Sequence, residues 1–412
     1  MRGAGPGVLS TAAPASDDGS STDVPVHGRL GKFGFFYFCY YAALGAYTPY
    51  IGRFVDALGH GGYVVGGMLG LWYGSRILAP PLWNAANARN PRPGLALVLG
   101  CLATLACFAG FTIARSTTQL FVVMAGFGLF YNALMPQFEA MTLAALGPRS
   151  HEYGRIRVWG SVGFLLVASS YGALLDRLGE RSFPWLCLPL FAALVAAAWL
   201  HRGAVPPRTA MQAGEHPIAD AGHLWKRPGV RRFLLVALLM QCGFGAFYVF
   251  YTLHLQAAGQ DGTAVGLLWG TGVLVEIALF WQAPRLIARF GAPALMSLCI
   301  GVTVLRWIVT ALYAGSLPIM FAAASLHAFS FAVFHACCMR QMAAYFPGRR
   351  AAAGQGLLYG FSSGVGGVLG AGLAAWMWDI GGGRAAFLAG AGVTALAWIL
   401  HALRDRNQWE RL

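Results

Sequence analysis

Charged side chains are scarce in this sequence of 412 residues. They make up 11% of it, whereas an ordinary soluble domain carries roughly a quarter. Hydrophobic residues make up 57% instead, and they gather in runs of the roughly 18 to 20 residues that a helix needs to cross a hydrocarbon core about 30 Å thick. The runs lack the alternating polarity of membrane-spanning β-strands. These features argue against a soluble protein and predict an all-α membrane protein.

Acidic residues are fewer than basic ones: 15 Asp and Glu stand against 29 Lys and Arg, which gives a formal charge of +14. In a soluble chain this excess would indicate nucleic acid as a partner. Here most basic residues fall in the tails and in alternate loops, as the positive-inside rule requires. We therefore expect no nucleic-acid partner. We expect a multi-pass protein of a bacterial-type inner membrane, in contact with lipid, with both termini in the cytoplasm.

Motifs of metal and nucleotide chemistry are also missing. The sequence contains no H-E-x-x-H zinc motif and no P-loop. Its eight cysteines lie within the apolar runs without the spacing of metal ligands, so we expect them to be packing residues. The sequence thus predicts neither an enzyme nor a protein with a cofactor or a metal.

The apolar runs divide the chain into two similar halves separated by a polar, proline-containing stretch. The predicted spans are residues 30–55, 62–84, 93–114, 118–146, 153–175 and 183–202, then 231–257, 263–285, 293–313, 317–345, 353–377 and 384–403. We predict 12 transmembrane helices in two pseudo-symmetric six-helix bundles. The expected units are a disordered cytoplasmic tail (1–29), the first bundle (30–202), a cytoplasmic linker (203–230), the second bundle (231–403) and a second cytoplasmic tail (404–412).

An ionisable side chain inside a span is costly in lipid and therefore indicates a functional site. The candidates are Arg76, Glu139, Arg157, Glu276, Arg306, His327 and His335. Asn132 and Glu139 share one stripe of their helix, and Arg157 begins the next span, within reach of Glu139. The two could bind a substrate, or they could form a static salt bridge that pins two helices. For Arg76, both cavity lining and a gate stay open.

The second half offers a similar set. Glu276 and Arg306 could form a second opposed pair. Glu276 could carry a proton with His327 as its neighbour, or it could be a protonated carboxyl group hydrogen-bonded inside the bundle. The tyrosines of the seventh span, Tyr248 among them, could line a cavity for a substrate with a ring or serve in packing.

Two runs within the predicted spans resemble helices of a known superfamily. The run N-A-L-M-P-Q-F-E (132–139), continued to residue 164, resembles the fourth and fifth helices of the lactose permease group of oligosaccharide/proton symporters. The run L-H-A-F-S-F-A-V-F-H (326–335) is similar to the tenth helix of the phenylpropionic acid permease-like branch. The resemblance covers residues 30–403. It implies the major facilitator fold and a secondary transporter in which Glu139 and Arg157 bind the substrate as a pair.

Two departures from the lactose permease group direct the expectation away from a sugar. Ser330 stands where that group has its protonated glutamate, and Ala88 replaces the aspartate that is usual in the superfamily's loop between the second and third spans. We expect a monomeric importer of a small organic solute, an aromatic or other carboxylate, by alternating access with proton symport. The expected substrate-binding residues are Asn132, Glu139, Arg157, Arg306 and Tyr248, and the expected proton-coupling residues are Glu276 and His327. The alternatives are a sugar or nucleoside proton symporter and a membrane sensor that transports nothing.

Overall fold

The structure is a computed structural model that describes residues 26–204, 227–347 and 350–403. Within these ranges the chain is helical and has no strand. This confirms the predicted all-α class. The predicted tails, except for the start of the first helix, and most of the predicted linker lie outside the described residues.

The first half of the chain forms long helices joined by short turns. Their bounds are α1 (Val26–Ala57), α2 (Gly62–Asn87), α3 (Pro93–Ala109), α4 (Thr117–Leu146), α5 (Tyr153–Leu178) and α6 (Phe183–Trp199). The turn before α4 ends where the sequence provides a helix cap. Ser116 and Gln119 form a capping box there, in which each side chain binds the other residue's backbone N–H group.

The helices of the second half are more often interrupted. Their bounds are α8 (Pro228–Gly243), α9 (Gly245–Ala257), α10 (Gly262–Phe290), α11 (Ala292–Tyr313), α12 (Leu317–Ser325), α13 (Phe334–Tyr345), α14 (Ala351–Leu358) and α15 (Gly367–Ala402). Two π-helical segments, η5 (Phe329–Val333) and η7 (Tyr359–Gly366), lie between α12 and α13 and between α14 and α15. The seventh, tenth and eleventh predicted spans are thus each built from more than one helical piece.

Nine helical stretches in the described ranges are long and apolar enough to cross a membrane. α1 and α2 are not among them, although they contain 32 and 26 residues. Tyrosines and glycines lower the mean hydropathy of α1, and glycines, two prolines and Arg76 lower that of α2. The last stretch, Ala353–Ala402, holds two predicted spans. It is broken at Gly381 and Gly382, where Gly382 has a φ of 61° that favours glycine. The predicted number of 12 spans remains a prediction.

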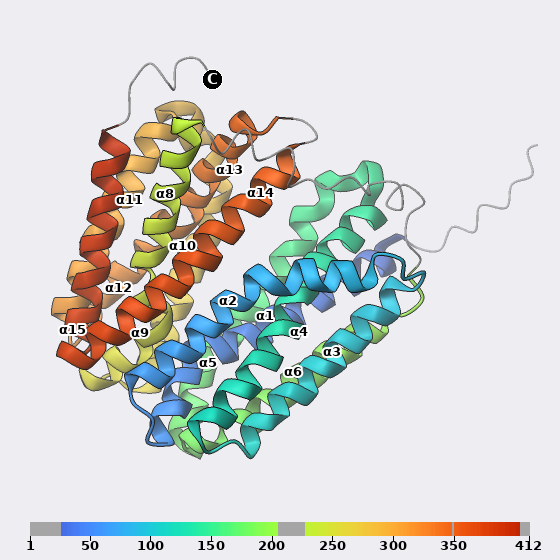
Figure 1. The fold of residues 1–412 in the computed structure, drawn as a ribbon, viewed down its shortest axis with the longest axis horizontal. Coiled ribbons are helices and arrows are strands. Elements are labelled where there is room, and N and C mark those ends of the chain that lie inside the picture. Colours follow the sequence, from blue (N-terminus) through green and yellow to red (C-terminus); the bar gives the residue numbers. More distant parts are fainter. Residues whose placement is uncertain (1–25, 205–226, 348–349, 404–412) are drawn as a thin grey trace, which may run out of the picture.

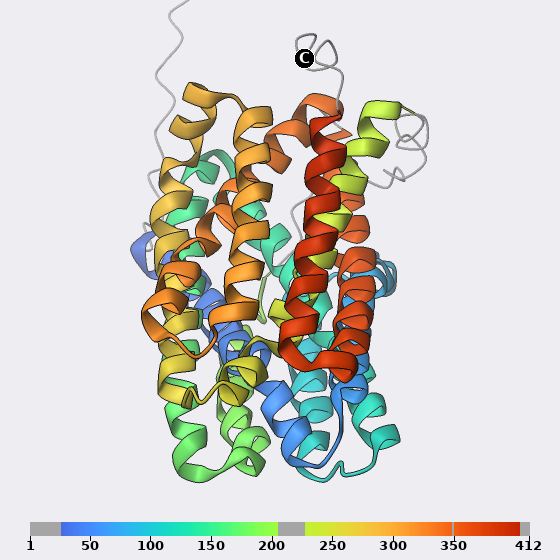
Figure 2. The same cartoon turned by 90° about the vertical axis from the view of Figure 1, so that its left-hand side faces the viewer.

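The helices gather into two groups that follow the two halves of the chain. In Figure 1 the blue to green helices of the first half lie beside the yellow to red helices of the second half, and Figure 2 looks onto the second half. In the first group α1 packs on α5 and α6, and α4 packs on α2 and α3. In the second, α15 packs on α8, α9 and α11. The groups meet where α5 contacts α10 and where α2 contacts η7 and α15.

The contact between α5 and α10 depends on glycine. A Cβ atom at Gly172 would collide with the carbonyl oxygen of Gly262, and one at Gly266 would collide with that of Ser169. Small residues of this kind let helices approach closely in a membrane, where packing and not the hydrophobic effect holds them together. The two halves are therefore tightly joined along the C-terminal part of α5.

Candidate functional site

The predicted pair of Glu139 and Arg157 is present but loose. Arg157 Nε lies 4.0 Å from Glu139 Oε1, and the two side chains are 30% and 39% exposed. The hydroxyl of Tyr153 donates to Glu139 Oε1 at 3.0 Å. The Arg157 guanidinium donates to the hydroxyl of Tyr41 and lies 4.1 Å from the centroid of that ring. α1 therefore holds Arg157 at least as firmly as Glu139 does.

Asn132 does not join this pair. Its side-chain nitrogen donates to the backbone oxygen of Trp72 at 3.2 Å and to Ser75 Oγ at 2.8 Å. Both N–H groups of the amide are thus engaged in tying α4 to α2. A role for Asn132 in substrate binding stays a prediction.

In the second half Glu276 pairs with His327 and not with Arg306. Glu276 Oε2 lies 3.3 Å from His327 Nε2, so the structure brings together the two residues predicted to couple protons. His327 stands just before η5, and π-helical turns frequently occur at functional sites. Its other ring nitrogen, Nδ1, is buried and has no hydrogen-bond partner in the described chain. His335 contacts the Tyr359 hydroxyl instead, at 3.4 Å.

Arg306 is the most deeply placed cation of the predicted set. It is 2% exposed, and its guanidinium carbon lies 4.4 Å from the ring centroid of Phe247 and 4.5 Å from that of Trp307. No carboxylate of the described residues lies within ion-pair distance, and Nη1 lacks any hydrogen-bond partner among them. A buried charge in this state is costly unless a further group neutralises it.

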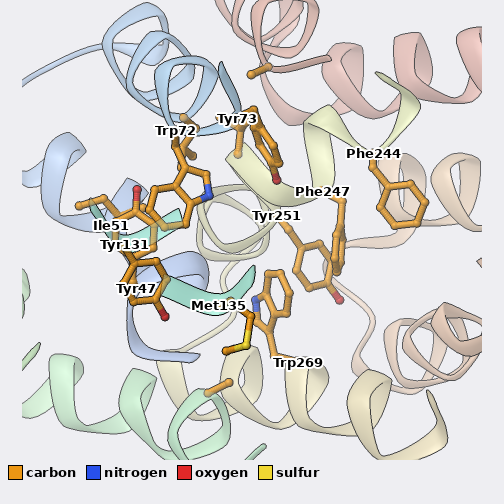
Figure 3. Packing of buried hydrophobic residues seen from close by; sticks show 14 of the residues in the cluster. Tyr47, Ile51, Trp72, Tyr73, Tyr131, Met135, Phe244, Phe247, Tyr251 and Trp269 are labelled. Atoms are coloured by element: carbon orange, nitrogen blue, oxygen red, sulfur yellow. The ribbon is translucent and has the colours of Figure 1, made fainter. Parts of the chain in front are cut away.

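Arg306 and His327 both line a small cavity in the second half. Its other lining residues are Phe247, Tyr251, Leu268, Trp269, Gly272, Val273 and Ala324, and it has about 10 Å³ of room for the centre of a water molecule. Figure 3 shows Phe247, Tyr251 and Trp269 grouped here, with Tyr73 of α2 lying between them and the aromatic cluster of the first half. The sequence places Trp269 on the same helical stripe as Glu276. Sequence reasoning did not single out Phe247, because aromatic residues are equally common in lipid-facing and packing positions.

Tyr248 lies beside the cavity and at the boundary between the halves. Its ring centroid is 5.5 Å from that of Phe244 and 6.1 Å from that of Tyr73. The side chain is partly exposed. The predicted residue therefore occupies a position from which it can contact a solute between the two halves.

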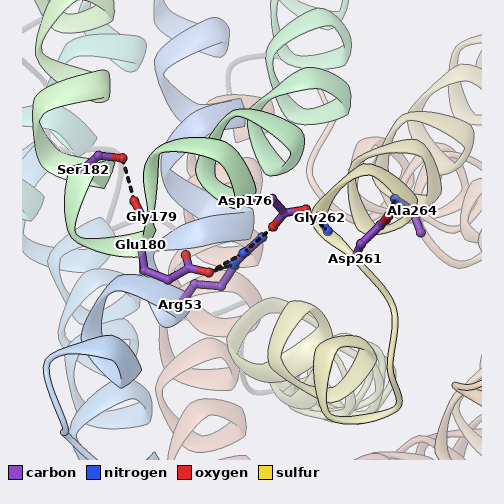
Figure 4. A network of polar contacts seen from close by, with 8 residues as sticks. All are labelled: Arg53, Asp176, Gly179, Glu180, Ser182, Asp261, Gly262 and Ala264. Carbon is purple, nitrogen blue, oxygen red and sulfur yellow. Dashed lines mark hydrogen bonds and ion pairs between the residues drawn. The ribbon is translucent and has the colours of Figure 1, made fainter.

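A second charged network closes the opposite end of α1 and α5. Arg53 Nη2 lies 2.7 Å from Asp176 Oδ1, and its Nε donates to Glu180 Oε1 at 2.8 Å. Asp176 Oδ2 in turn accepts from the backbone N–H group of Gly262, at 2.6 Å, at the start of α10. Figure 4 shows this series of contacts, which runs from α1 through α5 to the second half. A carboxylate at a helix N-terminus is favoured by the helix dipole.

In the sequence, Arg53 and Asp176 stand at the ends of predicted spans, where charged side chains can reach water at little cost. The structure instead buries Arg53, which is 3% exposed. The sequence does show that these two residues have opposite charges and lie at the same predicted membrane face, which is compatible with an ion pair. It gave no indication that the backbone of a residue more than 80 positions away completes the network.

A serine motif that sequence reasoning overlooked lies in the second half, and its role there is structural. Residues 360–364 read G-F-S-S-G, which matches the pattern of a nucleophile elbow. That motif requires a sharp turn between a strand and a helix, whereas here it lies in η7. Ser362 Oγ donates to the backbone oxygen of Leu358 at 2.7 Å. The stretch therefore does not present a nucleophile.

Residues 30–389 match the MFS_1 like family. The chain belongs to this family. It is accordingly a multi-pass membrane transporter of small solutes and not an enzyme, which confirms the superfamily that the sequence resembles.

Relatives in this family carry different solutes. The "Probable 3-phenylpropionic acid transporter" of Escherichia coli (strain K12) is 29% identical over 313 residues, which are 75% of this chain and 80% of the relative. The maltose permease of Geobacillus stearothermophilus is 27% identical over 304 residues, 71% of this chain and 73% of the permease. The crystal structure of the nucleoside transporter NupG matches with a TM-score of 0.79 at 14% identity, over 91% of this chain and 99% of NupG. That match shows the shared fold.

Proposed function

We propose that this family member moves a small organic carboxylate, with an aromatic group, across the membrane by alternating access of its two halves. The proposal depends on the buried positive charge of Arg306. A guanidinium that is 2% exposed and has no acidic partner in the described chain is balanced when an anionic solute binds. Its planar donor fork matches a carboxylate in a bidentate manner.

The surroundings of Arg306 support an aromatic solute. Phe247, Tyr251 and Trp269 line the same cavity, and aromatic pairs favour offset stacked or edge-to-face contacts. The relative named for 3-phenylpropionic acid supports the same class of substrate. Tyr248 and the Glu139–Arg157 pair are the proposed contacts from the boundary and from the first half, and Asn132 belongs to the same proposed set.

Proton symport is proposed through Glu276 and His327. The two groups lie 3.3 Å apart beside the substrate cavity, so a proton on either one can be shared with the other. Protonation of Glu276 would remove a negative charge close to the site where the substrate anion binds. Proton and substrate anion then favour each other's binding, which is the thermodynamic requirement for their coupling.

We also propose how the helices are arranged in the membrane. α1 and α2 span it in addition to the nine apolar stretches, and the last stretch spans it twice, turning at Gly381 and Gly382. This gives the 12 predicted spans in two six-helix bundles. Both termini then face the cytoplasm of a bacterial-type cell, the protein is a monomer of the inner membrane, and the proton gradient serves as energy source without a cofactor.

A sugar or a nucleoside is the second candidate substrate. The maltose permease and NupG favour it, and a tryptophan such as Trp269 can also stack on a sugar ring. Neither solute would balance the charge of Arg306, however. A membrane sensor on the same fold is the remaining alternative.

Counterflow in proteoliposomes separates these candidates. Vesicles containing the purified chain are loaded in turn with 3-phenylpropionate, its neutral amide 3-phenylpropanamide, maltose and uridine, and uptake of the labelled solute is measured. We expect saturable counterflow of the carboxylate and at least tenfold less of the amide, since a charge-assisted hydrogen bond to Arg306 contributes about 1.5–3 kcal/mol. Counterflow of maltose or uridine alone would assign the second candidate, and no flux of any solute would favour a sensor.

A further inference from the structure

Arg76 of α2 belongs to neither the Glu139–Arg157 pair nor the Glu276–His327 pair. Its guanidinium carbon lies 5.0 Å from the ring centroid of Tyr73 and 5.7 Å from that of Trp72. It makes no hydrogen bond and no ion pair with any residue of the described ranges. Aromatic rings attract a cation but do not neutralise it. Arg76 is therefore a second interior cation, besides Arg306, without a carboxylate in the described chain to balance it.

The sequences of α2 and α10 place Arg76 and Glu276 at corresponding positions. Each helix opens with three glycines spaced four residues apart, namely Gly62, Gly66 and Gly70 in α2 and Gly262, Gly266 and Gly270 in α10. Arg76 and Glu276 each stand fourteen residues after the first glycine. Both glycine faces pack on the other half of the molecule, Gly66 against Ala375 and Gly266 against Ser169. The two helices thus bring Arg76 and Glu276 to the same depth.

Tyr248 connects Arg76 with Arg306 across the boundary of the halves. Its ring centroid lies 6.1 Å from that of Tyr73, the residue one turn before Arg76 on the same side of α2. On the other side, the ring centroid of Tyr248 lies 5.4 Å from that of Phe247. The Phe247 ring in turn contacts Arg306 and His327, the partner of Glu276. The three charges therefore act on one region between the halves.

The charges of this region do not cancel. Arg76 and Arg306 contribute two positive charges, and Glu276 contributes one negative charge when it is ionised and none when it carries the proposed proton, so at least one positive charge is left over. A carboxylate offsets this positive charge, whereas a neutral solute leaves it uncompensated. Arg157 does not share this need, because the Glu139 carboxylate and the Tyr41 hydroxyl already face it.

We infer that Arg76 is the contact through which the first half of the chain binds the carboxylate that Arg306 binds in the second half. The anion then bridges the two halves. This inference rests on the proposed function and adds a specificity-determining residue to it. Removal of Arg76 leaves no carboxylate of the described chain unpaired, so the variant is expected to fold.

The test compares two probes that differ by one charge, 3-phenylpropionate and 3-phenylpropanamide. Their binding to the full-length chain in nanodiscs is measured for the wild type, Arg76→Gln, Arg76→Lys and Arg306→Gln. Arg285→Gln is the matched control, because it removes the same charge from an exposed position of α10. We expect Arg76→Gln to weaken binding of the carboxylate by about tenfold or more, the loss of one charge-assisted bond, with amide binding unchanged. Arg76→Lys should restore part of the difference, and Arg285→Gln should have no effect.

Three results would overturn the inference, and they are distinguishable. If Arg76→Gln keeps the wild-type preference for the carboxylate while Arg306→Gln loses it, Arg306 acts without Arg76 and the proposed function survives. If the wild type itself binds both probes equally, the proposed function fails and the inference falls with it. A loss of binding to both probes in Arg76→Gln, with no recovery in Arg76→Lys, would assign Arg76 a structural role and equally contradict the inference.

Discussion

Two buried nitrogens, Nη1 of Arg306 and Nδ1 of His327, have no hydrogen-bond partner among the described residues, and both side chains line the same cavity. Buried polar atoms are nearly always hydrogen-bonded in folded proteins, so such exceptions indicate a ligand, an ion or a catalytic role. Arg306 needs an anion, and His327 needs a donor or an acceptor according to its tautomer. At the scale of single residues, these two side chains therefore predict a small solute with a polar end, and they do so more specifically than any motif in the sequence.

Replacement of Glu276 by glutamine tests proton coupling at this scale. Addition of 3-phenylpropionate to the wild type in a weakly buffered solution should raise the pH, because substrate binding favours the protonated form of Glu276. Glu276→Gln cannot ionise and should show no such rise while it still binds the substrate. Asp379→Asn, an exposed carboxylate near the end of the eleventh predicted span, is the control and should behave like the wild type. Equal proton uptake in the wild type and in Glu276→Gln would exclude Glu276 as the carrier.

At the scale of helices, the close contact between α5 and α10 depends on glycine residues, which have no side chain to keep the two backbones apart. Gly172→Ala would push a methyl group into the carbonyl oxygen of Gly262 and should lower stability by about 1–3 kcal/mol, as overpacking does. Gly154→Ala on the same helix meets nothing within 4 Å and should be neutral or slightly stabilising, because alanine favours helix over glycine. Thermal unfolding in detergent compares the two. Equal midpoints would show that α5 and α10 are not closely packed.

The network of Arg53, Asp176 and the start of α10 should limit how easily the halves separate at that end. Asp176→Asn keeps an oxygen for the Gly262 N–H group but removes the charge that faces Arg53. We expect roughly fivefold faster hydrogen exchange at the start of α10, corresponding to about 1 kcal/mol. Asp56→Asn, an exposed residue near the end of α1, is the matched control. Unchanged exchange in Asp176→Asn would show that the network does not hold the halves together.

At the scale of the whole molecule, the sequence predicts the helical class and most helix positions, because lipid demands apolar runs of fixed length. It does not predict the breaks at Gly243 and at Gly381, since a glycine inside a span is compatible with a straight helix as well. It points to several of the interior charges, but it misses buried Arg53 and does not fix all of the partners. The pairing of Glu276 with His327, and not with Arg306, depends on how α10 packs on α12 and η5.

The two halves meet through three kinds of contact. Glycine contacts join α5 to α10, the Arg53 network closes one end, and the region around Tyr248 holds the charges left unbalanced. Alternating access requires the first two to open while the third keeps the solute. An anion shared by both halves would draw them together, which couples binding to the conformational change.

Uptake of labelled 3-phenylpropionate into proteoliposomes, driven by an inward proton gradient, tests the central claim that buried Arg306 is the anchor for a substrate carboxylate. We predict saturable uptake by the wild type and a loss of at least tenfold in Arg306→Gln, with both proteins folded by size-exclusion chromatography. Arg285→Gln should transport normally. Undiminished uptake of the carboxylate by Arg306→Gln would contradict the account.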